Sequence, residues 1–183
     1  MISHNWLLIS YKVPSEPARK RIALWRKLKA LGAVYIQNGV CLLPKNEEHT
    51  RQLKIIENEI ANMAGECVLL ESVALDGVQE EKVIARFCSD RDEEYTEFLG
   101  KCLDFENEIA KETAIKHFTF SELEENDAEL KKLKTWLEKI MKLDFYKSLM
   151  SETATLRLNK CEILLEEYAK KVFEASDDNC QDC

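Results

Sequence analysis

Six cations lie within residues 19–29, and their spacing suits the binding of anions. On a helix that turns by about 100° per residue, Arg19 and Arg26 share one flank, and Lys20 and Lys27 lie on the opposite side. Lysine and arginine side chains in such a row contact the phosphates of a nucleic acid. The candidate nucleic-acid-binding residues are therefore Arg19, Lys20, Arg26, Lys27 and Lys29.

Arg21 occupies a different place on the same expected helix. If Ala18, Ile22, Trp25 and Leu28 face a sheet, Arg21 falls between Trp25 and Leu28 on the apolar side. A buried arginine usually has a carboxylate or carbonyl partner inside the protein, which predicts an internal salt bridge. Alternatively, its planar guanidinium binds an oxyanion or a phosphate through two parallel hydrogen bonds. The residues alone leave both interpretations open.

Motifs of catalysis are missing from the sequence. It contains no GxGxxG, Walker A, HExxH or GxSxG pattern, and its three histidines are scattered, at His4, His49 and His117. We therefore expect no enzyme and no cofactor. One acidic run offers oxygen ligands for a hard cation, or is the solvated face of a charged helix: Asp90, Asp92, Glu93 and Glu94.

The seven cysteines fall into two groups. Five lie in segments of periodic apolar residues, where a reduced cysteine acts as a small core side chain: Cys41, Cys67, Cys88, Cys102 and Cys161. Cys180 and Cys183 form a C-x-x-C that supplies two of the four thiolates of a structural zinc site. They are weak metal candidates, and a disordered tail at residues 177–183 is the alternative that we favour.

The net charge of −8 hides a division between the two ends of the chain. Residues 1–54 carry ten Lys/Arg against three acids, a balance of +7, so the remaining residues carry −15. A basic region on an acidic molecule binds polyanions locally, because salt screens the field within about 10 Å. Attraction between the two parts of the chain is an equally good explanation.

Turn and strand signals predict a small sheet domain over residues 1–76. Residues 6–13 read as a strand that ends at Pro14, and a helix follows from an N-cap at Ser15 to Leu31, where Gly32 stops it. Two short strands then surround Asn38-Gly39, which favours a type I′ hairpin turn. A helix capped by Asn46 runs to Gly65, and residues 67–74 form the last strand. This βαββαβ order predicts an α+β, ferredoxin-like domain.

From residue 77 the apolar period becomes helical. One stripe steps by three and four residues: Ile84, Phe87, Arg91, Tyr95, Phe98, Cys102, Phe105 and Ile109. Ser121 and Glu124 form a capping box for a second helix, which presents Leu123, Leu130, Leu133, Leu137 and Ile140. A third presents Ala154, Leu158, Cys161, Leu165, Tyr168 and Val172. Residues 77–176 are thus predicted to form a helical hairpin or bundle that packs on itself, on the sheet or on a second subunit.

Residues 1–9 contain neither a cationic stretch nor an apolar run of signal-peptide or membrane-span length. We therefore expect a cytoplasmic protein with no membrane association.

Several segments carry a family resemblance. They are Trp6-Leu-Leu, Tyr11-Lys-Val-Pro14, Ser15-Glu-Pro-Ala-Arg-Lys-Arg21, Trp25-Arg-Lys-Leu28, Leu31-Gly-Ala33, Gln37-Asn-Gly-Val40 and Leu43-Pro44. Later ones are Arg91 with Glu94-Tyr95, Phe118-Thr-Phe with Glu122-Leu-Glu-Glu125, and Trp136-Leu with Asp144-Phe145. As a combined string over most of residues 5–150, they resemble the N-terminal domain of the chromate resistance regulator ChrB.

The resemblance implies a DNA-binding transcriptional regulator of a chromate-responsive operon, with Arg19, Arg21 and Arg26 as candidate contacts to the operator. Members of that family carry a C-terminal domain implicated in sensing, whereas this chain ends soon after the helical segment. The resemblance therefore implies a stand-alone version with a separately encoded partner. Two alternatives remain: an oxyanion-binding or redox accessory protein that binds chromate through Arg21 or the tail cysteines, and a homodimerisation scaffold.

Overall fold

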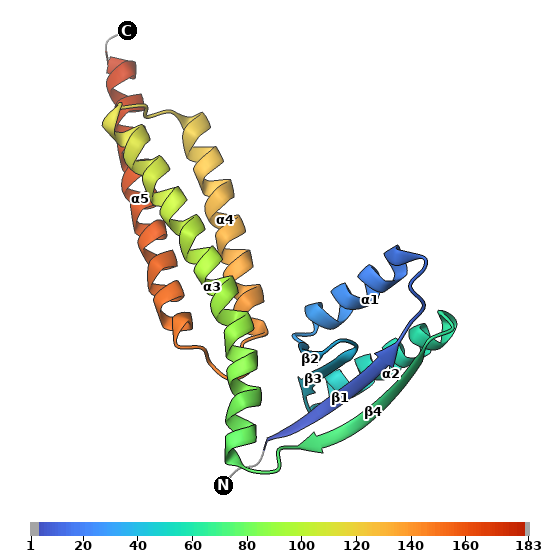
Figure 1. Cartoon of the computed structure of the whole chain (residues 1–183). Helices are drawn as coiled ribbons and strands as arrows, with labels where there is room; N and C mark the ends of the chain where they lie inside the picture. The colour runs from blue at the N-terminus through green and yellow to red at the C-terminus, as the bar shows by residue number, and fades with distance from the viewer. Residues whose placement is uncertain (1–3, 182–183) are drawn as a thin grey trace. The chain divides into compact units, whose positions relative to one another are not determined.

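The structure of the chain is a computed structural model that describes the backbone of residues 4–181 and the side chains of residues 4–177. In chain order its elements are β1 (Asn5–Lys12), α1 (Ala18–Ala30), β2 (Val34–Gln37), β3 (Val40–Pro44), α2 (Glu47–Asn62), β4 (Glu66–Val73), α3 (Gly77–Ala114), α4 (Phe120–Lys142) and α5 (Met150–Gln181) (Figure 1). The predicted α+β class is confirmed. The chain divides into two compact units at Asp90/Arg91, inside α3.

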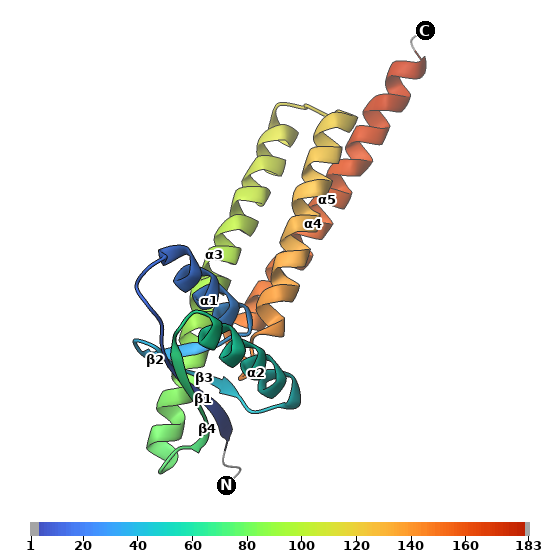
Figure 2. The same ribbon diagram turned by 90° about the vertical axis from the view of Figure 1, so that its right-hand side faces the viewer.

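The first unit contains a four-stranded antiparallel sheet in the order β2-β3-β1-β4. Alternate residues of β1 and β3 face α1 and α2, so both helices cover the same face of the sheet (Figure 2). The buried core between these layers consists of Leu7, Ile9, Leu24, Leu28, Ala33, Cys41, Leu43, Leu53, Ile56 and Ile60. The period-two pattern of the strands and the apolar stripe of α2 therefore meet in one core.

Helix α1 packs on the sheet with a face that shares only Leu28 with the predicted one. Leu24 and Leu28 are buried, whereas Ile22 and Trp25 are 47% and 48% exposed. The segment holds two overlapping apolar stripes, and the sheet takes the one about 100° further round the helix. The expected cap at Ser15 is also wrong, because the N-cap is Pro17 and Glu16 accepts from the Ala18 amide at 3.3 Å. Gly32, at φ +82, ends the helix as predicted.

The hairpin between β2 and β3 forms at Asn38-Gly39, but its turn is not of type I′. That type needs positive φ at both residues, whereas only Gly39 has it, at +72. The register shifts between Tyr35 and Gln37, so that one residue of β2 bulges. A Cβ on Gly39 would lie 2.4 Å from the Tyr11 carbonyl oxygen, and the Gly39 carbonyl accepts from the Tyr11 amide at 2.7 Å. The backbone of the turn at Gly39 therefore packs directly against the end of β1 at Tyr11.

Helix α2 begins as predicted, because the side chain of Asn46 accepts from the His49 amide at 2.6 Å. Its end differs from the prediction, since Ala64, at φ +57, and not Gly65 takes the left-handed conformation. Gly65 is needed for space instead: a Cβ there would lie 2.7 Å from the Lys12 carbonyl oxygen.

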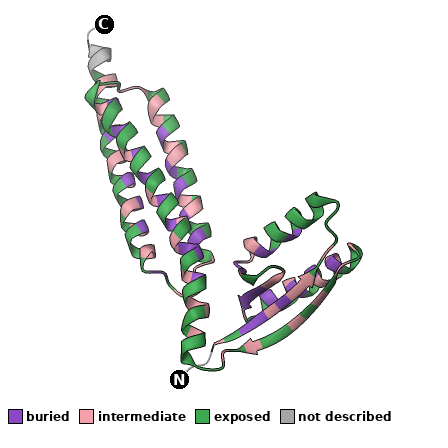
Figure 3. Ribbon diagram, viewed as in Figure 1, coloured by how far each residue is buried: buried purple, intermediate pink, exposed green. Residues whose placement is uncertain are grey.

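In the second unit, α3, α4 and α5 run side by side and share one core (Figures 1 and 3). The predicted stripe residues from Phe87 to Ile109, from Leu130 to Ile140 and from Ala154 to Val172 are buried, whereas Ile84 and Leu123, with which two of the stripes were predicted to begin, are only partly buried. Buried Arg91 pairs with Glu94 at 2.9 Å. The cap of α4 is Thr119, whose hydroxyl accepts from the Glu122 amide at 3.3 Å, so the predicted Ser121 box lies two residues too late.

Two predictions about the C-terminal end and the cysteines have different outcomes. Helix α5 continues to Gln181, into the segment where we expected a disordered tail, and no Gly or Pro interrupts residues 177–181. Cys41, Cys102 and Cys161 are buried as core thiols, whereas Cys67 and Cys88 are only partly buried. No helix in the described part of the chain is long and apolar enough to cross a membrane.

Candidate anion and nucleic-acid site

The cations of α1 separate into paired and unpaired groups. Lys27 forms an ion pair with Glu59 of α2, and Lys29 Nζ lies 2.5 Å from Asp90 Oδ2. Arg19, Lys20 and Arg26 are exposed and form no ion pair with any described residue. Three of the five candidate nucleic-acid-binding residues therefore have charges that no carboxylate of residues 4–177 neutralises.

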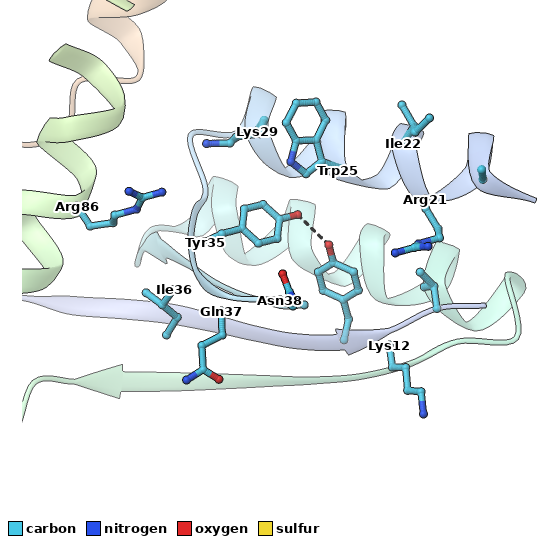
Figure 4. A pocket seen from close by; sticks show the side chains of 14 residues that line it. Lys12, Arg21, Ile22, Trp25, Lys29, Tyr35, Ile36, Gln37, Asn38 and Arg86 are labelled. Atoms are coloured by element: carbon cyan, nitrogen blue, oxygen red, sulfur yellow. Dashed lines mark hydrogen bonds between the residues drawn. The ribbon is translucent and has the colours of Figure 1, made fainter. Parts of the chain in front are cut away.

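Arg21 is exposed and faces a pocket instead of the core. Among the described residues it has no ion-pair partner, so the internal salt bridge that we considered is not formed there. The pocket has a volume of about 900 Å³ and lies within the first unit. Its walls come from the end of β1, from α1, from the β2–β3 hairpin and from the start of α3 (Figure 4).

Two tyrosines in this pocket hydrogen-bond to each other, with Tyr11 and Tyr35 hydroxyl oxygens 2.8 Å apart. Burial raises the pKa of both phenols, while the hydrogen bond with Tyr35 and then the nearby Arg21 guanidinium oppose this for Tyr11. Both therefore keep their protons at neutral pH. Since one proton lies between the two oxygens, the other is available to a ligand.

Positive charge dominates the pocket lining. Lys12, Arg21, Lys29 and Arg86 line it, and none of the described residues that line it carries a carboxylate. Lys29 and Arg86 share buried Asp90, with Arg86 Nη2 3.5 Å from Asp90 Oδ1. Lys12 and Arg21 have no such partner in the described part of the chain. The side chain of Lys12 points away from the pocket, on the opposite face of β1 from Tyr11 (Figure 4). The pocket therefore offers one unneutralised cation, Arg21, and neutral phenol donors, which suits an anion.

The acidic run at residues 90–94 does not converge on one point. Asp90 pairs with Lys29 and Arg86, Asp92 accepts from the Ser148 hydroxyl, and Glu94 pairs with Arg91. These carboxylates thus have separate protein partners.

A different group, which the sequence reasoning missed, brings three potential ligand atoms within 4.8 Å of one another: Glu112, His117 and Glu122. His117 Nδ1 lies 2.6 Å from Glu112 Oε2, and this hydrogen bond lowers the pKa of Glu112. The only signal in the sequence was a histidine at a helix break. The contacts already satisfy Glu112, and the group ties the end of α3 to the start of α4.

The pocket was also missed, apart from Arg21. Its tyrosines stand on the core-facing side of β1 and β2, where strand alternation places residues 7, 9 and 11 together. Tyr11 and Tyr35 come close together only because the strands are arranged in the order β2-β3-β1-β4, which strand alternation alone does not predict. Of the weak metal candidates, Cys183 and the side chain of Cys180 lie outside the described residues.

The model of a known family, described as "Protein ChrB, N-terminal", matches residues 21–179. This chain belongs to the ChrB N-terminal family. The match confirms the predicted resemblance and includes Arg21, Trp25 and Arg26.

A curated relative, Protein ChrB of Cupriavidus metallidurans, is 33% identical over 94 residues, which are 51% of this chain and 28% of the relative. The matched region thus spans less than a third of that protein. No solved structure matches the chain.

Proposed function

We propose that this member of the ChrB N-terminal family is a DNA-binding transcriptional regulator associated with chromate resistance, and that α1 contacts the operator of its own operon. The observation that carries the proposal is the set of exposed, unpaired cations on α1: Arg19, Lys20 and Arg26. A protein cation without an internal partner gains most from a phosphate, because binding releases the counterions of the DNA.

The same reasoning gives Lys27 and Lys29 a smaller part in the interface. Each already has a carboxylate within ion-pair distance, so a phosphate would have to compete with Glu59 or Asp90. The protein acts by binding in this proposal, without catalysis or cofactor, and it works in the cytoplasm. The order β1-α1-β2-β3-α2-β4 with both helices on one face supports a ferredoxin-like classification of the first unit.

The direct test is fluorescence anisotropy of labelled duplex DNA from upstream of the operon, titrated with the protein at two salt concentrations. We expect binding that weakens steeply with salt. Absence of binding at low salt would refute the proposal.

A second candidate function is that of a non-catalytic accessory protein that binds an oxyanion such as chromate, and the unpaired Arg21 in the pocket favours it. Ligand binding to the folded state raises the melting temperature by mass action. Chromate at millimolar concentration should therefore raise the melting temperature, and Arg21→Gln should abolish the shift. No shift in the unsubstituted protein would exclude this function.

Assembly is part of the proposal too. We expect a homodimer, because operators read by regulators are often two-fold symmetric. Light scattering at micromolar concentration separates a dimer from a monomer.

A further inference from the structure

The pocket beside Arg21 is larger and more aromatic than a small inorganic oxyanion requires. Its volume of about 900 Å³ is in the range of sites for organic ligands, roughly 300–1,000 Å³. Tyr11, Tyr35 and Trp25 line it, together with the apolar side chains of Ile22 and Ile36. A tetrahedral anion would contact few of these aromatic and apolar side chains. A ligand with a flat apolar ring would contact more of them.

Trp25 of α1 does not belong to the buried core between α1 and the sheet. It is 48% exposed, although a tryptophan on an amphipathic helix would ordinarily be buried. It is one of the residues that line the pocket, and in Figure 4 its ring lies beside α1, above Tyr35. Indole and phenol rings are platforms on which a nucleobase stacks.

The polar groups are separated along the pocket. Arg21 stands near the end of β1, where the phenol pair offers its free proton, whereas the side chain of Lys12 points away from the phenols in Figure 4. Asn38 of the hairpin points its side-chain amide, which is both a donor and an acceptor, toward the tyrosines, whereas the amide of Gln37 points away from them in Figure 4. A guanidinium suits a phosphate, and amides suit the edge of a base.

We propose that this pocket binds a nucleoside monophosphate unit, with the base stacked at Trp25 and the phosphate held by Arg21. A free mononucleotide and an unpaired nucleotide of a nucleic acid share this chemistry. The inference rests on the pocket and not on the proposed binding of duplex DNA, because Arg19, Lys20 and Arg26 do not line the pocket.

The test is calorimetric titration of the full chain with AMP, GMP, CMP and UMP, and with adenosine and inorganic phosphate as the two halves of the ligand. We expect at least one monophosphate to bind at least tenfold more tightly than either half. It should also quench the emission of Trp25, which is missing from the Trp25→Phe protein. Equal binding of inorganic phosphate, or no binding of any monophosphate at millimolar concentration, would overturn the proposal.

Variants separate the pocket from general electrostatic attraction. Arg21→Gln and Trp25→Ala should each weaken monophosphate binding at least tenfold, since both side chains are at the surface and their loss leaves the core intact. Arg51→Gln removes an exposed arginine of α2 outside the pocket, one that pairs with Glu48, and should change binding less than twofold. An equal loss in Arg51→Gln would refute a specific site.

A single-stranded dodecanucleotide identifies the source of the ligand. Binding of the strand that depends on Trp25 and is displaced by the monophosphate supports an unpaired nucleotide as the occupant. Monophosphate binding without strand binding supports a free nucleotide. Binding of duplex DNA is tested separately with the Arg19→Gln/Arg26→Gln protein, because these two arginines do not line the pocket. The proposal of duplex binding can therefore fail while the proposal of monophosphate binding holds, and the reverse.

Discussion

Removing the two exposed arginines on one flank of α1, in the variant Arg19→Gln/Arg26→Gln, should change the salt dependence of DNA binding by a calculable amount. Arg19, Lys20 and Arg26 are the cations of α1 that no described carboxylate neutralises. If each neutralises one phosphate, the slope of log K against log salt is about −2.7 for the unsubstituted protein and about −0.9 for the variant. Between 50 and 200 mM salt, these slopes correspond to losses of roughly 40-fold and roughly fourfold.

The slope is a sharper readout than the affinity. A substitution that merely perturbs folding lowers the active fraction and leaves the slope unchanged, whereas loss of phosphate contacts lowers the slope itself. Arg51→Gln is the matched control, because it removes an arginine of the same unit that already pairs with Glu48. We expect its slope to equal that of the unsubstituted protein.

Anisotropy titrations of labelled duplex at four or more salt concentrations supply the slopes, with circular dichroism to establish that each variant is folded. A double variant that retains a slope near −2.7 would show that α1 is not the contact surface. A loss of slope in the Arg51→Gln control would show that the interaction senses only net charge.

Three further predictions concern stability. Gly39→Ala should destabilise the first unit by about 2–4 kcal/mol in urea denaturation, because its φ is +72 and the new Cβ would lie 2.4 Å from the Tyr11 oxygen; Gly77→Ala, where nothing lies within 4 Å, is the control. Gly100→Ala should stabilise the helical unit by about 0.5–1 kcal/mol, since Gly100 is exposed inside α3 with open space around it, and an unchanged or lowered denaturation midpoint would refute this. His117 and then Lys111 lower the pKa of Glu112 below 4.5, so its contribution to stability is present above pH 4.5 and disappears as the pH falls through the lowered value. Thermal melts should show a smaller acid-induced loss in Glu112→Gln, and an identical pH profile would contradict the assignment.

Much of the backbone was predictable because local chemistry decides it. Gly32 ends α1 and Asn46 begins α2 as expected, since each acts on groups within a few residues of itself. The stripes of α3, α4 and α5 were also correct, because a long helix with one apolar face has one way to bury it. Errors appear where two local solutions compete, as at the caps Ser15 and Ser121.

The orientation of α1 shows what periodicity leaves undecided. Leu24 and Leu28 form one stripe, and Ile22 with Trp25 forms another beside it. Each pattern is helical, and only packing against the sheet selects between them. Because the sheet packs against Leu24 and Leu28, Trp25 and Arg21 line the pocket and are not buried in the core. Arg21 is therefore interpreted as a ligand-binding residue and not as part of an internal salt bridge.

The long-range partners of the cations could not be predicted from spacing. The pairs Lys27–Glu59 and Lys29–Asp90 join residues far apart in the chain, and they exist because α2 and α3 pass close to α1. They reduce the predicted phosphate-binding row from five residues to the three that remain unpaired.

The ion pairs also bear on the excess of positive charge in residues 1–54. Five of its ten cations pair with carboxylates of the first unit. Four of these carboxylates come from the acidic remainder of the chain, as the alternative of attraction between the two parts predicts: Glu57, Glu59, Glu71 and Asp90. The five without a partner among the described residues are Lys12, Arg19, Lys20, Arg21 and Arg26, which all lie within residues 12–26. Because four of these five cations belong to α1, where three are exposed away from any described carboxylate and Arg21 lines the pocket, the surplus favours binding of an external polyanion.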